Sequence, residues 1–264
     1  KGMVITMKLY WNYFLMELKS QMQYKASFFL TALGQFITAF TTFFGIRFLF
    51  DRIHGVDRFT YGQVLLCFAV IMMSFALGEI AGGGLAVFPD LLREGELDRI
   101  LVRPRSILLQ IVMPNMDFSR LGLLAQALLV LCAAIPASKV AWTPKKALVL
   151  LLMVLCGSVI FFCLFLLVAS VAFFTLQSFE FLNIFTYGMR DFGRYPLSVY
   201  GEEMLKLLTF VIPLALIQYY PLLYLLDQAE GIRYAAAPLF SLLFVLPSAA
   251  LYRLGVRNYK SAGS

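Results

Sequence analysis

The sequence predicts an all-α polytopic membrane protein with six transmembrane helices. Of its 264 residues, 61% are hydrophobic and only 14% are charged. Soluble domains average about 45–50% apolar and about 25% charged residues, so this composition indicates a bilayer protein. The apolar runs are continuous rather than alternating, and several reach the roughly 20 residues that a spanning helix needs. Continuous runs favour helices, which satisfy their own backbone hydrogen bonds in lipid.

The net charge of +7 has a simple explanation in such a protein. Basic residues flank membrane spans and set their orientation, so nucleic-acid binding is not expected. The four cysteines lie within apolar runs, where thiols behave as small hydrophobic groups. No spacing of Cys and His residues indicates a metal site, and we predict none.

The chain begins with an amphipathic segment, residues 1–26. Apolar side chains, including Tyr10 and Trp11, recur there at helical spacing among lysines such as Lys8 and Lys19. This pattern predicts a helix that lies in the plane of the membrane interface. An ordinary soluble amphipathic helix is the alternative.

Residues 27–256 form the predicted transmembrane domain, followed by a tail at 257–264. The predicted spans are residues 27–50, 61–84, 118–135, 147–169, 172–193 and 234–252. The stretch from Ala147 to Phe179 carries no charge and as one helix would be about 50 Å long, more than the roughly 30 Å of a bilayer core. We therefore expect a turn near Ser170, between the fourth and fifth spans.

Residues 203–226 are apolar but contain Pro213 and Pro221. Proline kinks or breaks a helix, so this stretch is either part of a re-entrant pair of short helices, residues 195–226, or the real fifth span, with residues 180–202 left in the cytoplasm. Both versions place the two termini on one side. Basic residues near the termini outnumber those in the opposite links, which predicts cytoplasmic termini in a multi-pass plasma-membrane protein. Charge counting alone favours the second version.

A charged island, residues 89–103, separates the second and third predicted spans. A short helix of mixed character can seat its apolar face in a groove of a soluble partner and pair its charges around the rim. A plain cytoplasmic loop is the alternative. The residues that we assign to docking are Asp90, Leu91, Leu92, Arg93, Glu94, Gly95, Glu96, Leu97, Asp98, Arg99 and Leu101.

The island resembles a segment of a known family. The run Gly95-Glu96-Leu97-Asp98-Arg99-Ile100-Leu101-Val102-Arg103-Pro104 is similar to the Gly-x-Leu-Asp-x-x-Leu-x-x-Pro segment of type-2 ABC exporter permeases. A second match is the run at 192–200, and a third is 210–213 followed by 219–221. Together the three matches resemble the viologen-exporter-like subgroup, whose permeases are often encoded in pairs. The resemblance covers nearly the whole chain.

This resemblance implies a permease that works as a homodimer or heterodimer. The island would be the coupling helix between spans 2 and 3, docked on a separate ABC ATP-binding subunit that holds ATP and Mg. The N-terminal helix would lie along the cytoplasmic interface, and 195–226 would re-enter from the outer face, which decides our choice of the re-entrant version. The chain has no G-x-x-x-x-G-K-[ST] motif, so we expect neither ATPase activity nor a cofactor of its own.

Two carboxylates are candidates for a substrate path. Glu79 lies late in the second predicted span, where a buried carboxylate faces a cavity or a partner, unless it is hydrated at the boundary. Glu180, with Phe181 and Phe185, would suit a cationic apolar substrate through charge and cation–π contacts. A cytoplasmic or salt-bridged Glu180 is the alternative.

The function that these observations predict is the permease subunit of an ATP-driven exporter, for example in multidrug or antibiotic efflux. An ion-coupled secondary transporter is the alternative, although the broken helix at Pro213 and Pro221 has no clear counterpart in the first half. A membrane enzyme acting on lipid ranks third, because the chain has one histidine and no HExxH motif.

Overall fold

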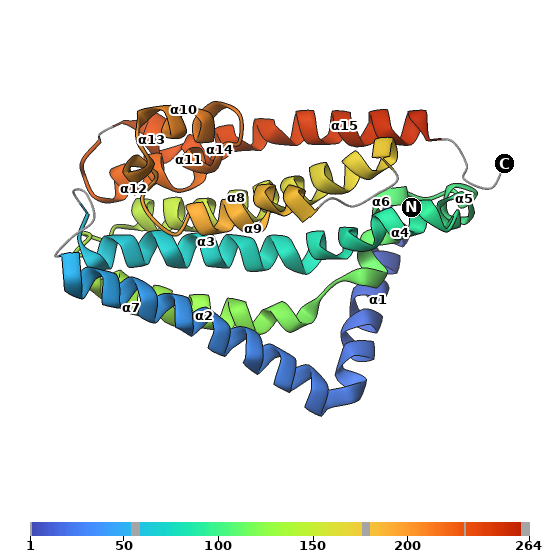
Figure 1. Ribbon diagram of the computed structural model, residues 1–264, viewed down its shortest axis with the longest axis horizontal. Coiled ribbons are helices and arrows are strands. Elements are labelled where there is room, and N and C mark those ends of the chain that lie inside the picture. Colours follow the sequence, from blue (N-terminus) through green and yellow to red (C-terminus); the bar gives the residue numbers. More distant parts are fainter. Residues whose placement is uncertain (1, 54–58, 176–179, 230, 260–264) are drawn as a thin grey trace.

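The computed structural model describes residues 2–53, 59–175, 180–229 and 231–259 (Figure 1). The chain is 85% helical with no strands among these residues, which confirms the predicted all-α fold. Five helices are long and apolar enough to cross a membrane, and a bent helix pair brings the candidate spans to six. The protein is therefore a multi-pass membrane protein.

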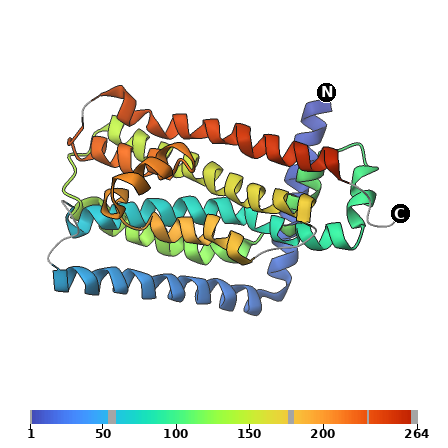
Figure 2. The same ribbon diagram turned by 45° about the horizontal axis from the view of Figure 1, so that its top comes forward.

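The first two helices have very different directions. Helix α1, Gly2–Gln21, lies crosswise to the long helices of the bundle, whereas α2, Lys25–Ile53, runs along the bundle (Figures 1 and 2). The short 3-10 turn Met22–Tyr24 makes the corner between them. Gln21 holds the end of α1 to the bundle, because its Oε1 accepts a hydrogen bond of 3.0 Å from the Phe118 amide.

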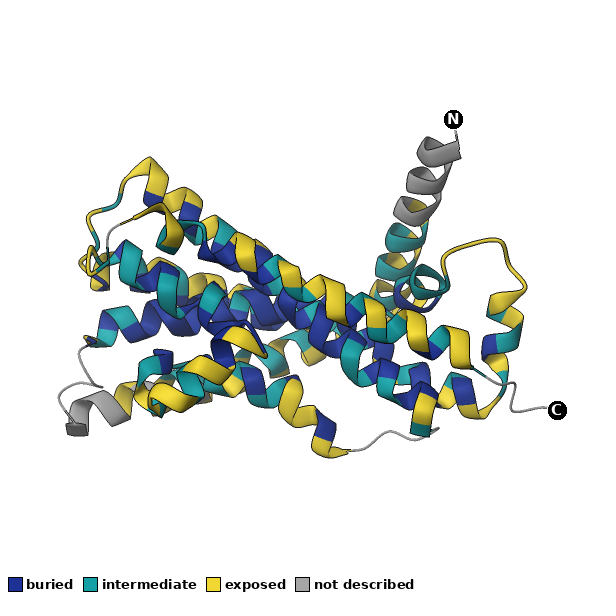
Figure 3. Cartoon of the chain, turned by 90° about the horizontal axis from the view of Figure 1, so that it is seen from above, coloured by how far each residue is buried: buried dark blue, intermediate teal, exposed yellow. Residues whose placement is uncertain are grey.

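The centre of the bundle is α3, Tyr61–Gly82, packed between α7, Leu121–Ala137, and α8, Pro144–Thr175. All side chains from Val64 to Met72 are buried, and Figure 3 shows buried residues in dark blue along the centre of the bundle. Glycines bring the backbones close. A Cβ on Gly62 would lie 2.0 Å from the Ala137 carbonyl oxygen, so these two helices pack nearly backbone to backbone.

The structure corrects the predicted boundary between the fourth and fifth spans. Helix α8 continues past Ser170 to Thr175, because Ser170 is buried and its hydroxyl donates to the Leu166 carbonyl without breaking the helix. Residues 172–193 therefore do not form one spanning helix. After α8, the 3-10 helix η5, Glu180–Phe185, and α9, Tyr187–Phe192, lead back along the bundle (Figure 1).

Short helices cap the end of the bundle that lies opposite the island (Figure 1). They are α10, Glu202–Phe210, α11, Leu214–Ile217, and α12, Tyr219–Leu225, with a bend of 86° after α10. Pro213 lies at the break, as predicted. Pro221 does not break α12, because it lies in the first turn, where the missing backbone donor is not needed.

The chain returns toward the island through α13, Ile232–Ala235, α14, Ala237–Ser241, and α15, Val245–Asn258. The C-terminal end of α15 consequently lies at the same end of the bundle as the island and α1 (Figures 1 and 2). The third predicted span begins with a 3-10 turn, Phe118–Arg120, that leads into α7. The cytoplasmic location of this end stays a prediction.

Candidate functional site

The charged island is a pair of short helices rather than one. Helices α4, Phe88–Arg93, and α5, Glu96–Leu101, meet at Gly95, whose φ of 71° is a conformation that favours glycine. The 3-10 helix η2, Gly83–Val87, joins α3 directly to α4. Continuous helical backbone therefore joins the island to α3 at the centre of the bundle.

The island exposes its charges and buries two of its leucines. Asp90 and Arg93 form an ion pair at the surface, with about 60% of each side chain exposed. Leu92 and Leu97, which we assigned to docking, are 0% exposed. They cannot face a partner in this structure and instead anchor the helix pair to the protein core. The exposed apolar surface next to the charges comes from Leu101 and Val102.

An aromatic cluster joins the island to two long helices. Phe88 of α4 is buried and meets Phe173 of α8 edge to face, with ring centroids 4.7 Å apart. Phe173 also packs against Tyr252 of α15 at 6.1 Å. A Cβ on Gly255 would lie 2.3 Å from the Phe173 ring, so α15 passes very close to α8 here. The three helices α4, α8 and α15 thus meet at one side chain.

Beside the island, Glu79 is the centre of a buried polar cluster. Glu79 is 1% exposed, and its Oε1 accepts a 2.8 Å hydrogen bond from the Tyr187 hydroxyl. Arg120 Nη2 lies 3.3 Å from the same oxygen, and Arg120 Nε lies 3.1 Å from Asp117 Oδ2. Arg120 therefore bridges the carboxylates of Glu79 and Asp117. Glu79 Oε2 is buried and has no hydrogen-bond partner among the described residues.

Two neighbouring cavities open beside this cluster. One of about 380 Å³ is lined by Glu79 and Asp117, and one of about 340 Å³ is lined by Glu180. Gly83 and Tyr187 line both cavities. Each volume falls within the roughly 300–1,000 Å³ of small-molecule sites, so each has room for a small molecule.

The structure separates the other residues of the predicted substrate path. Glu180 is exposed, and Pro89 of the island lines the same cavity, so Glu180 lies at the island end rather than at mid-span. Glu180 lies there because α8 extends to Thr175, beyond its predicted end at residue 169. Phe185 lines a different, apolar cavity of about 260 Å³, and Phe181 is 67% exposed. These two aromatic rings do not line the Glu180 cavity.

Sequence reasoning missed Tyr187, which joins the two cavities and binds Glu79. Its nearest signal was Arg190, one helical turn later, whose guanidinium lies 5.4 Å from the Tyr187 ring centroid and 4.8 Å from that of Phe75. The described residues contain no group of three or more His, Cys, Asp or Glu side chains placed to hold a metal ion.

Comparison with known proteins identifies the family. The model of the ABC-2 family transporter proteins matches residues 36–263, a range that includes the island, the Glu79 cluster and the short helices at the opposite end. No curated protein and no solved structure matches the chain. Members of this family are membrane components and are not the ATPases of their transporters, in agreement with the missing phosphate-binding motif. The protein belongs to the ABC-2 family and is a membrane permease component of an ABC transporter.

Proposed function

We propose that this chain is the permease subunit of an ATP-driven exporter and that α4 and α5 dock on the ATP-binding subunit. One observation carries this proposal: the island is held to the core by Leu92 and Leu97 while most of its charged side chains stay exposed at the end of the bundle. A loop without a partner needs no such anchoring. ATP and Mg would be bound by the partner, not by this chain.

The packing around the island supports a mechanical coupling. Close-packed interiors transmit displacement, because they have little free volume. A push on α4 reaches α3 through η2, and it reaches α8 and α15 through Phe88 and Phe173. When two ATP-binding subunits close, the ends of these three long helices would move together. This movement would switch the substrate path from inward-facing to outward-facing.

In this scheme the cavities beside Glu79 and Glu180 are the cytoplasmic entry of the path. Both cavities lie next to the island, so a displacement of the island by the closing ATP-binding subunits would change the shape of the cavities. A second permease, identical or related, would complete the path. The exported substrate would enter from the cytoplasm and leave near the short helices α10 to α12.

The test reverses charge on the island. The double variant Glu94→Lys, Glu96→Lys places cations where we expect contact with the partner, and like charges across an interface cost several kcal/mol. We expect at least a tenfold loss of co-purified ATP-binding subunit, together with a loss of ATP turnover of the complex.

The matched control is Glu202→Lys, Glu203→Lys, the same change on exposed side chains at the opposite end. If the control variant forms the complex and turns over ATP as wild type does, the loss in the Glu94→Lys, Glu96→Lys variant is specific to the island. Wild-type behaviour of Glu94→Lys, Glu96→Lys would disprove docking through this segment.

A further inference from the structure

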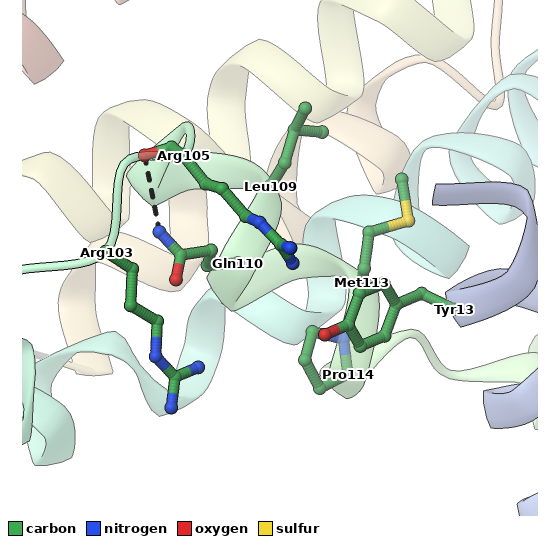
Figure 4. A pocket seen from close by; sticks show the side chains of 7 residues that line it. All are labelled: Tyr13, Arg103, Arg105, Leu109, Gln110, Met113 and Pro114. Carbon is green, nitrogen blue, oxygen red and sulfur yellow. Dashed lines mark hydrogen bonds between the residues drawn. The ribbon is translucent and has the colours of Figure 1, made fainter. Parts of the chain in front are cut away.

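A small cavity lies where α1 meets the connection between α5 and α6, Ile107–Val112 (Figure 4). Tyr13 of α1 lines it from one side, and Arg103 and Arg105 of the connection line it from the other. Its volume of about 100 Å³ is that of roughly three water molecules. A drug-sized molecule needs about 300 Å³ or more, so a small polar group fits here and a transported substrate does not.

The two arginines give this cavity its charge. Both side chains are exposed, and neither forms an ion pair with another residue of the described ranges. Exposed guanidiniums without a carboxylate partner retain their full attraction for an anion. Their planar donors match a phosphate group better than a lysine ammonium does.

Gln110 fixes the backbone of the connection that carries the two arginines. Its Nε2 donates to the Arg105 carbonyl at 3.3 Å (Figure 4) and also to the Ile100 carbonyl at 3.4 Å. These bonds tie the connection to α6 and reduce the ordering that a ligand would have to induce.

The position of the cavity indicates where such a ligand comes from. Helix α1 lies crosswise to α3 and α8, in the direction of a membrane surface if these helices span the bilayer (Figures 1 and 2). Leu109, Met113 and Pro114 add an apolar lining beside the arginines. Tyrosine is enriched at membrane interfaces, and basic pockets between helices on the cytoplasmic side bind anionic headgroups.

We infer that this cavity binds the phosphate of an anionic lipid, such as phosphatidylglycerol. Arg103 and Arg105 hold the phosphate, and the acyl chains extend beside α1. The bound lipid would fasten α1 to the base of the island. This inference depends on the membrane placement of α1 and not on the direction or substrate of transport.

The test is a titration of the purified full-length chain in neutral detergent with dioctanoyl-phosphatidylglycerol, followed by native mass spectrometry. A basic residue near a membrane surface contributes about 1 kcal/mol to binding of anionic lipid, so Arg103→Ala, Arg105→Ala should weaken binding about 30-fold. The matched control Arg253→Ala, Arg257→Ala removes the same charge from exposed side chains of α15 and should bind as wild type does. Arg103→Lys, Arg105→Lys should show an intermediate loss, since it retains charge without the planar donors.

Three results would overturn the proposal. Equal binding by wild type and Arg103→Ala, Arg105→Ala would exclude the cavity as the site. Glycerol phosphate binding as tightly as the lipid would indicate a soluble phosphate ligand. Unchanged lipid binding together with loss of the ATP-binding subunit would assign the two arginines to that partner. Loss of lipid binding with normal complex formation and ATP turnover would support the lipid site and leave the proposed coupling role untouched.

Discussion

The two ends of the bundle are both built from short helices, yet they use their surfaces in opposite ways. At the end opposite the island, Leu214, Ile217 and Leu222 are 0% exposed. Gln218 is also buried there, and its Nε2 donates to the Tyr195 carbonyl at 3.0 Å. The island, in contrast, buries Leu92 and Leu97 and exposes most of its charged residues.

This difference follows from the stability of short helices. A helix of fewer than about 12 residues is marginal in isolation and depends on tertiary packing. The helices α11 and α12 bury nearly their whole apolar surface in that packing. The island is anchored by a few side chains, and the rest of its surface remains free for a partner.

The largest expected effect contrasts a buried leucine with an exposed valine. Leu214→Ala should lower the free energy of unfolding by about 2–5 kcal/mol, because it leaves a cavity among buried side chains. Val102→Ala should change it by less than about 0.5 kcal/mol, since 84% of Val102 is exposed. Unfolding in a denaturant titration of the purified chain measures both. Similar losses in the two variants would show that the island is as tightly packed as the opposite end.

Composition and charge patterning were sufficient to predict much of this architecture. The apolar runs predicted the all-α membrane fold, and the mixture of charges at 89–103 marked the island. Asp117 and Arg120 are three residues apart and form an ion pair, as that spacing favours. In each case the signal lies within a few neighbouring residues, where helical periodicity fixes the geometry.

The failures have physical causes of a different kind. A charge-free run contains no local signal for its boundary, so the expected turn at Ser170 was placed from bilayer thickness alone, and α8 extends beyond it. Amphipathic patterning does not say which face of α4 and α5 packs inward, and Leu92 and Leu97 were assigned outward. Tyr187 lies 108 residues from Glu79 in the chain, so their contact appears only after folding.

A smaller effect is expected from the polar cluster at the island end. Tyr187→Phe removes the hydrogen bond to the buried Glu79 carboxylate, and hydrogen bonds to charged groups contribute about 1.5–3 kcal/mol. Tyr224→Phe, at the opposite end, is the matched control, because its hydroxyl has no hydrogen bond to another described residue. We expect its free energy of unfolding to stay within about 0.5 kcal/mol of wild type. A loss in Tyr224→Phe equal to that in Tyr187→Phe would mean that the Glu79 cluster adds nothing specific to stability.

The smallest effect concerns the ion pair of Lys146 with Asp227, whose Nζ and Oδ2 atoms are 2.7 Å apart. It joins the start of α8 to the residues after α12. The Lys146 side chain is 8% exposed, but that of Asp227 is 68% exposed, so water screens the pair. A double-mutant cycle with Lys146→Met and Asp227→Asn should give a coupling free energy of about 0–1 kcal/mol in the isolated chain. If the coupling rises above this range only in the assembled transporter, a second permease covers Asp227 there. The short helices α10 to α12 would then lie at a subunit interface. Both ends of the bundle would be docking surfaces, one for a second permease and one for the ATP-binding subunit.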